Sequence, residues 1–187
     1  LMFICSKMGM DFVQFGPKGH QIPDGALLIG TDEERAVFGK ELMAIGEENC
    51  KISGGTITVS DDISCIEGAD FVYTDVWYGL YDEEVSSTSY MDVFYPKYQV
   101  TWDLMNAAGP DSKFMHCLPA NRGEEVVDEV MDDPERSLCW DEAENRKHSI
   151  RAILATLCPQ SEPNPEKATN YRATIDECMA KLGKQGL

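Results

Sequence analysis

The stretch Phe114-Met115-His116-Cys117-Leu118-Pro119-Ala120 decides the fold that this sequence predicts. A short apolar run ends abruptly in a histidine, a thiol and a proline, which is typical of a buried strand that carries polar groups to the edge of a sheet. Proline has no N–H to donate and fixes its own φ, so Pro119 ends the strand. Ligands of open α/β sheets bind beyond the carboxyl ends of parallel strands. We therefore expect the chemistry of this chain at that edge.

Strand and helix signals alternate on both sides of this stretch. After a helix tail at residues 1–10, strands are predicted at 11–15, 56–59, 71–74 and 137–140, and helices at 31–47, 63–66, 100–108, 124–131 and 141–157. This alternation favours an α/β fold, a Rossmann-like parallel sheet flanked by helices. If the strands are parallel, Asp75 ends its strand at the same sheet edge as His116. The aromatic and acidic residues 78–98 fit either a functional loop with helical pieces or an Ω-loop packed by its own aromatics.

A proline-rich hinge and a further helix follow the last predicted helix. Residues 166–182 form an amphipathic pattern, and an isolated helix of that length is marginal in water, so this extension has to dock on another surface. We divide the chain into a domain at residues 1–158 and a hinge with a C-terminal extension helix at 159–187. A neighbouring subunit is favoured over the chain's own domain as the docking surface.

The composition excludes several classes of function. A formal net charge of −17 and a pI near 4.4 argue against a sequence-independent grip on nucleic acid. An acidic surface usually serves solubility, and it also favours the approach of a cationic substrate. No apolar run reaches the ~20 residues of a membrane span. The seven cysteines are odd in number and include no Cys-x-x-Cys pair, which favours reduced thiols in a cytoplasmic protein over a disulfide framework or a metal cluster.

Four blocks of sequence resemble one enzyme family. His116-Cys117-Leu118-Pro119 resembles the HCLP signature of the ornithine and related carbamoyltransferases. Its companions stand in the family's order: Thr74-Asp75-Val76-Trp77, Tyr98-Gln99-Val100 and Asp141-Glu142-Ala143-Glu144-Asn145-Arg146. The resemblance covers residues 7–157 and implies carbamoyl phosphate and an amine acceptor as substrates, no cofactor, and a homotrimer. The family's phosphate-binding Ser-x-Arg-Thr motif is missing from these residues, so we expect the second, acceptor-binding domain without its first strand.

The resemblance assigns roles to individual residues. His116 and Arg146 are expected to bind the carbonyl oxygen of carbamoyl phosphate, where amine attack builds an oxyanion and a preorganised donor contributes about 3–4 kcal/mol. From the residues alone, His116 also fits a structural histidine and Arg146 a surface arginine. Cys117 is expected to orient the attacking nitrogen together with the Leu118 carbonyl, whose direction Pro119 fixes. A covalent role for Cys117 is disfavoured, because the sequence pairs no base with it.

The acceptor site is expected around Asp75, Trp77 and Tyr78. In the ornithine pattern a Ser-Met-Gly run follows, whereas this chain has Gly79-Leu80-Tyr81. Loss of the serine removes a polar contact suited to an α-amino acid, so the slot fits a bare diamine and resembles the putrescine-type members of the family. The alternatives are an ornithine-type enzyme, a non-catalytic paralogue, or a nucleotide-binding domain. The nucleotide-binding domain is disfavoured because no Gly-x-Gly-x-x-Gly motif opens a predicted helix of this sequence.

Overall fold

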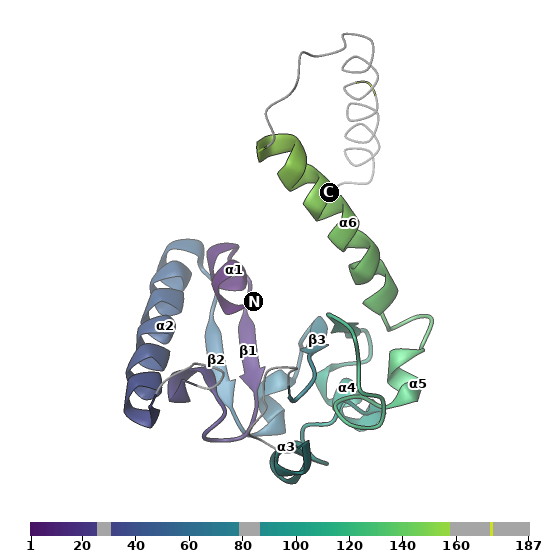
Figure 1. The fold of residues 1–187 in the computed structure, drawn as a ribbon, viewed down its shortest axis with the longest axis horizontal. Helices are drawn as coiled ribbons and strands as arrows, with labels where there is room; N and C mark the ends of the chain where they lie inside the picture. The colour runs from purple at the N-terminus through teal and green to yellow at the C-terminus, as the bar shows by residue number, and fades with distance from the viewer. Residues whose placement is uncertain (26–30, 79–86, 158–172, 174–187) are drawn as a thin grey trace. The chain divides into compact units, whose positions relative to one another are not determined.

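Two pairs of short parallel strands, each pair joined through helices, make up the sheet structure of the chain (Figure 1). The computed structural model describes residues 1–25, 31–78, 87–157 and 173, and the chain divides into two units, residues 1–143 and 144–187. The predicted extension helix at 166–182 lies outside the described residues, except for Ala173, which is helical. None of the described helices is long and apolar enough to span a membrane.

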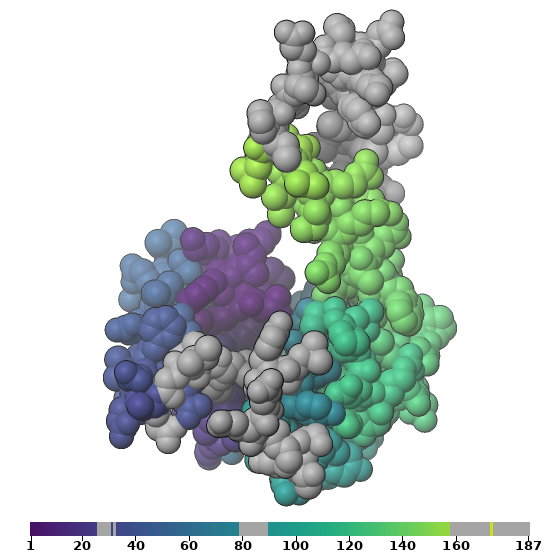
Figure 2. All heavy atoms as spheres, viewed as in Figure 1, coloured from purple at the N-terminus to yellow at the C-terminus, as the bar shows by residue number. Residues whose placement is uncertain are grey.

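The first strand pair joins β1 (Phe12–Phe15) to β2 (Ile57–Ser60) in parallel. The connection runs through the 3-10 helix η1 (Ile22–Asp24) and the helix α2 (Asp32–Ser53). The short helix α1 (Met2–Lys7) precedes β1 and packs against α2, as the purple and blue atoms of Figure 2 show.

Local sequence signals explain where α2 begins and ends. The Thr31 hydroxyl accepts a hydrogen bond from the Glu34 N–H at 3.3 Å, and the Glu34 carboxylate accepts one from the Thr31 N–H at 2.9 Å, so both orphan donors are satisfied. The pKa of Glu34 is lowered, mainly by the backbone hydrogen bond from Thr31. The predicted end at residue 47 is wrong. The helix continues to Ser53, where Gly54 adopts the left-handed conformation that ends it.

The second strand pair joins β3 (Phe71–Thr74) to β4 (Lys113–His116), again in parallel. Before β3 lies the 3-10 helix η2 (Ile63–Ile66), and between the strands lie α3 (Ser87–Phe94) and α4 (Trp102–Ala108). After β4 come α5 (Asp128–Met131) and α6 (Cys139–Leu157).

The hydrophobic core lies around β4 and the helices beside it. Phe114 is fully buried, and the side chains that share its cluster come from η2, α4, α5, the start of α6 and the segments before α4 and α5: Ile66, Val100, Leu104, Met105, Ala108, Val126, Val130, Met131 and Cys139. Burial alternates along β4, with Phe114 and His116 buried between partly exposed neighbours. Because side chains on a strand alternate between its two faces, Phe114 and His116 lie on the same face of β4. The core therefore fixes the face of the strand that carries His116.

The structure confirms the α/β class with parallel strands and corrects three details. Among the described strands, hydrogen bonding gives two separate two-stranded sheets rather than one. The predicted strand at 137–140 is a single parallel bridge between Phe114 and Ser137, because α6 already begins at Cys139. The predicted helix at 124–131 shrinks to α5, because Val126 bridges to Val100 and the Glu125 side chain turns inward to His116.

Candidate active site

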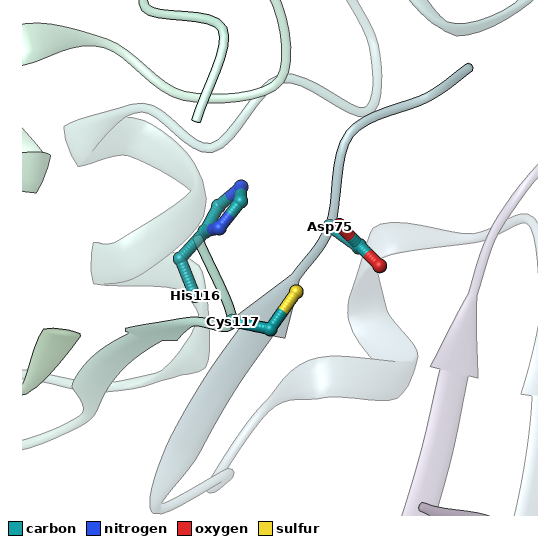
Figure 3. Close-up of side chains that lie close together, drawn as sticks. All are labelled: Asp75, His116 and Cys117. Carbon is teal, nitrogen blue, oxygen red and sulfur yellow. The ribbon is translucent and has the colours of Figure 1, made fainter. Parts of the chain in front are cut away.

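The register of β3 and β4 brings the predicted site residues together. Thr74 lies opposite His116 in the parallel ladder, so Asp75 and Cys117 both leave the sheet at the same edge. Ligand atoms of Asp75, His116 and Cys117 all lie within 4.8 Å of one another. Figure 3 shows these three side chains gathered beyond the strand ends, with the Cys117 sulfur turned toward Asp75. The expected convergence of Asp75 and His116 is confirmed.

His116 is completely buried, and both of its ring nitrogens are engaged by the protein. Nδ1 accepts a hydrogen bond from the Leu118 N–H at 2.9 Å, so in this arrangement it carries no proton. The proton therefore sits on Nε2, which donates to the Glu125 carboxyl oxygen Oε1 at 3.1 Å. In this geometry both ring nitrogens are engaged by the chain itself, and the role predicted for His116 toward the carbonyl oxygen of a substrate stays a prediction.

The turn after β4 carries the remaining groups of the HCLP block. Leu118 has φ +58, a left-handed conformation that is uncommon for a residue other than glycine, and its peptide bond to Pro119 is cis. The Leu118 N–H is bonded to the His116 ring, as described above. Cys117 and Pro119 are exposed and Leu118 is half-buried, so this turn is accessible from outside, unlike the histidine beneath it.

Cys117 is a thiol, not a thiolate, at neutral pH. Although the residue as a whole is exposed, partial burial of its thiol raises the pKa to about 11, and the hydrogen bond and charge of Asp75 act in the same direction. A high pKa disfavours a nucleophilic cysteine, because the thiolate is the reactive form. The thiol is suited instead to donate to Asp75, whose Oδ1 also accepts from the Val76 N–H at 2.8 Å.

Tyr73 and Glu142 form a second polar contact at this edge. The Tyr73 hydroxyl donates to Glu142 Oε1 at 2.9 Å, while Glu142 Oε2 is buried without a partner among the described residues. Burial, followed by the contact with Glu142, raises the pKa of Tyr73 far above its usual value. The first turn of α6 therefore reaches the end of β3, as the predicted meeting of these elements required. The pattern of the sequence did not single out Tyr73, because it occupies an ordinary strand position.

Trp77 and Tyr78 are held by the aromatic residues of α3. The Trp77 ring stacks on Phe94 at 5.6 Å between centroids, and Tyr78 stacks on Tyr90 at 6.5 Å. The Tyr78 hydroxyl also lies 3.4 Å from Glu124 Oε1, to which it donates. These contacts show how residues 87–94 support the chain just after Asp75. The run Gly79-Leu80-Tyr81, on which the choice of acceptor rested, lies outside the described residues.

Arg146 lies on α6 in the second unit, and its side chain is exposed. Its backbone carbonyl accepts a hydrogen bond from the Ser149 hydroxyl at 3.0 Å. Nearby on the same helix, Glu144 pairs with Lys147 at 3.3 Å. The predicted role of Arg146 toward the carbonyl oxygen therefore stays a prediction from the sequence.

Asp75, His116 and Cys117 are close enough together to be considered as metal ligands. A histidine binds a metal through a ring nitrogen with a free lone pair. The Nδ1 lone pair of His116 already accepts from Leu118, and Nε2 carries the proton given to Glu125. A metal would have to displace one of these buried bonds, so we assign the trio to hydrogen bonding and orientation.

Glu125 is the residue of this site that sequence reasoning missed. It is completely buried, although glutamate is rarely fully buried unless it is paired. Its Oε1 accepts from His116 Nε2 and also from the Asn121 N–H at 2.6 Å. The only signal was its place one residue before the apolar pair Val126-Val127, in a stretch whose pattern predicts a helix.

Comparisons with known proteins identify the family of the chain. Residues 1–157 match the family model described as aspartate/ornithine carbamoyltransferase, Asp/Orn binding domain. The chain is 36% identical over 184 residues to a putrescine carbamoyltransferase of Mycoplasma mycoides, covering 95% of this chain and 45% of the relative. It is 39% identical over 158 residues to an ornithine carbamoyltransferase of Pyrococcus abyssi, covering 84% of this chain and 44% of the relative.

Solved structures give the same result. The ornithine carbamoyltransferase from Pyrococcus furiosus superposes with a TM-score of 0.64 at 38% identity, covering 82% of this chain and 44% of that one. The enzyme from Gloeobacter violaceus gives a TM-score of 0.62 at 34% identity, covering 85% of this chain and 46% of that one. The chain thus spans just under half the length of the relatives it matches. It belongs to the aspartate/ornithine carbamoyltransferase family and matches that family's Asp/Orn-binding domain.

Proposed function

We propose that the protein containing this chain transfers a carbamoyl group between carbamoyl phosphate and an amine of putrescine, in either direction. The observation that carries this proposal is the meeting of Asp75, Cys117 and the Leu118 turn beyond the ends of β3 and β4, in a chain of the carbamoyltransferase family. An exposed carboxylate suits a cationic acceptor, because it attracts the ammonium form of an amine.

The chemistry needs groups that orient a neutral amine nitrogen. As the nitrogen attacks the carbonyl carbon, a C–N bond forms, the C–O bond to phosphate breaks, and the departing phosphate takes up the proton that the nitrogen loses. We assign the Leu118 carbonyl to accept a hydrogen bond from the amine N–H. Asp75 is assigned to stabilise the positive charge that develops on the amine nitrogen, while the Cys117 thiol is hydrogen-bonded to Asp75. No covalent carbamoyl-cysteine is part of this scheme.

Putrescine is preferred as the acceptor because of Gly79-Leu80-Tyr81, where the ornithine pattern has serine, methionine and glycine. The 36% identity to the putrescine carbamoyltransferase of Mycoplasma mycoides over 95% of the chain supports the same choice. A site without a partner for the α-amino and α-carboxyl groups leaves those groups unpaired in ornithine, which lowers the affinity for that acceptor.

An ornithine acceptor is the second candidate. The relative from Pyrococcus abyssi is an ornithine carbamoyltransferase at 39% identity, slightly above the putrescine relative but over less of the chain. Steady-state assays with carbamoyl phosphate and each amine in turn decide between the two. We expect kcat/KM for putrescine to exceed that for ornithine by about tenfold or more, and a preference for ornithine would establish the second candidate instead.

Arg146 is proposed to bind the carbonyl oxygen of carbamoyl phosphate. Because loss of one preorganised donor at an oxyanion costs about 100-fold or more in kcat, we expect Arg146→Ala to lower kcat by that amount. Arg151→Ala is the matched control, since this arginine lies on the same helix with an exposed side chain. Equal kcat values for the two variants would remove Arg146 from the mechanism.

We infer from the family that the active protein is a cytoplasmic homotrimer, with the segment after residue 158 contacting a neighbouring subunit. The clustered prolines 159, 163 and 165 and the amphipathic pattern of residues 166–182 support this inference. Sedimentation of the protein at micromolar concentration tests it directly, with a monomer as the contradicting result.

A further inference from the structure

Glu125 bonds to both ends of the turn that follows β4. Its Oε1 accepts from the ring of His116, where the turn begins, and from the backbone N–H of Asn121, where it closes. The His116 ring in turn accepts from the backbone N–H of Leu118, in the middle of the turn. One buried carboxyl oxygen thus holds the turn at its start and its end directly and at its centre through the imidazole.

The groups held in this way are those that we assign to the acceptor amine. The turn contains Cys117, Leu118 and Pro119, and the left-handed φ of Leu118 sets where its carbonyl points. A leucine adopts that conformation only when its surroundings enforce it. The hydrogen bond from Leu118 N–H to His116 Nδ1 is the contact that the structure offers for this purpose.

We propose that Glu125 is a positioning residue: it keeps the proton of His116 on Nε2, so that Nδ1 can hold Leu118 N–H and aim the Leu118 carbonyl at the acceptor amine. The kinetic part of this proposal rests on the proposed function. The tautomer part depends only on the hydrogen bonds of the folded chain.

The chemistry of imidazole explains why an acceptor is needed at this place. A neutral ring has one N–H, and a buried N–H without an acceptor is unfavourable. If the Glu125 carboxyl is removed, the proton is no longer favoured on Nε2 and can move to Nδ1. An Nδ1–H would then face the Leu118 N–H, two donors would oppose each other, and the left-handed turn would lose its support.

Glutamine offers a close substitute for Glu125. Glu125 Oε2 is buried and has no hydrogen-bond partner among the described residues, so only Oε1 is used by the turn. The amide of Gln has one oxygen to replace Oε1 and an NH₂ to occupy the unpartnered side. Glu125→Gln should therefore preserve the tautomer, whereas Glu125→Ala should not.

The tautomer is measured by NMR on protein with ¹⁵N-labelled histidine, without any substrate. We expect the unsubstituted protein and Glu125→Gln to show a protonated Nε2 and an unprotonated Nδ1 for His116. We expect Glu125→Ala to lose this pattern and to exchange the Leu118 amide proton about tenfold faster or more. A proton on Nδ1 in the unsubstituted protein overturns the proposal, even if Glu125→Ala does not fold.

Kinetics supply the second measurement. We expect Glu125→Ala to reduce kcat/KM for the amine by about 10- to 100-fold, because misplacing an orienting group by a fraction of an ångström is enough for such a loss. Glu125→Gln should stay within about threefold of the unsubstituted enzyme, since its oxygen still accepts both hydrogen bonds. Glu129→Ala, an exposed position on α5, is the matched control and should not change the rate.

The two measurements separate failure of this proposal from failure of the proposed function. If the protein transfers no carbamoyl group to any amine, the proposed function fails, and the NMR result still decides the role of Glu125. If Glu125→Gln keeps the tautomer but loses as much activity as Glu125→Ala, the carboxyl acts by its charge and the positioning role is wrong. Retained tautomer and activity in Glu125→Gln, lost together in Glu125→Ala, support it.

Discussion

The two strand pairs have the same parallel pairing, but the residues that follow their strands differ in what they contact. β1–β2 and β3–β4 each pair four residues in register. Past β2, the polar residues are used by the chain itself: Asp61 pairs with Lys18 at 3.2 Å, and the Asp62 carboxylate caps η2 through the Ser64 N–H at 3.0 Å. Past β3 and β4, the strands deliver Asp75 and Cys117 to an exposed position.

This difference shows that a parallel edge by itself is not a site. At β1–β2, every residue of β1 is partly exposed, and of the charges that follow β2, Asp61 pairs with Lys18 while Asp62 caps η2. At β3–β4, a fully buried histidine and glutamate support a left-handed turn from below. Buried polar side chains that hydrogen-bond to the exposed turn therefore distinguish the β3–β4 edge from the β1–β2 edge. Substitutions at the two edges should have different effects.

The largest expected contrast is between two aspartates, one from each edge. Asp75→Asn removes the charge that we assign to the acceptor, and a hydrogen bond to a charged group contributes about 1.5–3 kcal/mol, so kcat/KM for the amine should fall about 10- to 150-fold. Asp61→Asn should leave kcat/KM unchanged, because Asp61 faces Lys18 at the other edge. Steady-state kinetics of both variants measure the contrast, and equal losses would erase the distinction between the edges.

The reactivity of Cys117 gives the next contrast, between the folded and unfolded chain. With a pKa of about 11, the thiol stays protonated at pH 8, and its alkylation rate should keep rising with pH until about 11. Compared with an ordinary thiol, the thiolate fraction falls about 100-fold, while the greater nucleophilicity of a more basic thiolate recovers about tenfold. Iodoacetamide should therefore modify Cys117 about tenfold more slowly at pH 8 in the folded chain than in urea, as peptide mass spectrometry can measure. A folded rate that levels off below about pH 9 would contradict the protonated thiol.

The smallest expected effect on activity belongs to the β1–β2 side. A methyl group on Gly39 of α2 would overlap the backbone of Ile22 and Gly25, whereas one on Gly16 would meet open space. Overlap costs about 1–3 kcal/mol, which exceeds the gain of about 1 kcal/mol in helix propensity from Gly to Ala. We expect Gly39→Ala to lower the urea midpoint with little change in kcat, and Gly16→Ala to change neither. Loss of kcat in folded Gly39→Ala would show that this half contributes to the chemistry.

Much of the architecture could be predicted because local signals and global fold agree. The bounds of β3 follow from its β-branched and aromatic run, and the helix after residue 100 begins where the Thr101 hydroxyl accepts from the Leu104 N–H at 3.4 Å. The meeting of Asp75 with His116 needed only parallel strands of equal length. These predictions depend on neighbours in sequence or on strand geometry alone.

The parts that sequence reasoning missed depend on contacts across the fold. Glu125 looks like an exposed helical residue until His116, nine positions earlier, is seen to need an acceptor. The part of α2 past residue 47 contains Cys50 and Ser53, residues with no strong helix preference, and packing against α1 favours the helix there. Tertiary contacts thus decided the features that local propensity left open.

The alternating burial of β4 has a consequence for the evolution and engineering of this chain. No hairpin ties β3 to β4, so their register depends on which faces of β4 are buried. Insertion of one residue within residues 113–116 would exchange the two faces, carrying His116 to the surface and Met115 inward. An insertion in the exposed turn at residues 110–111 would leave that frame intact. Length changes are therefore tolerated before β4 and not inside it, which marks the turn as the place to graft a reporter peptide.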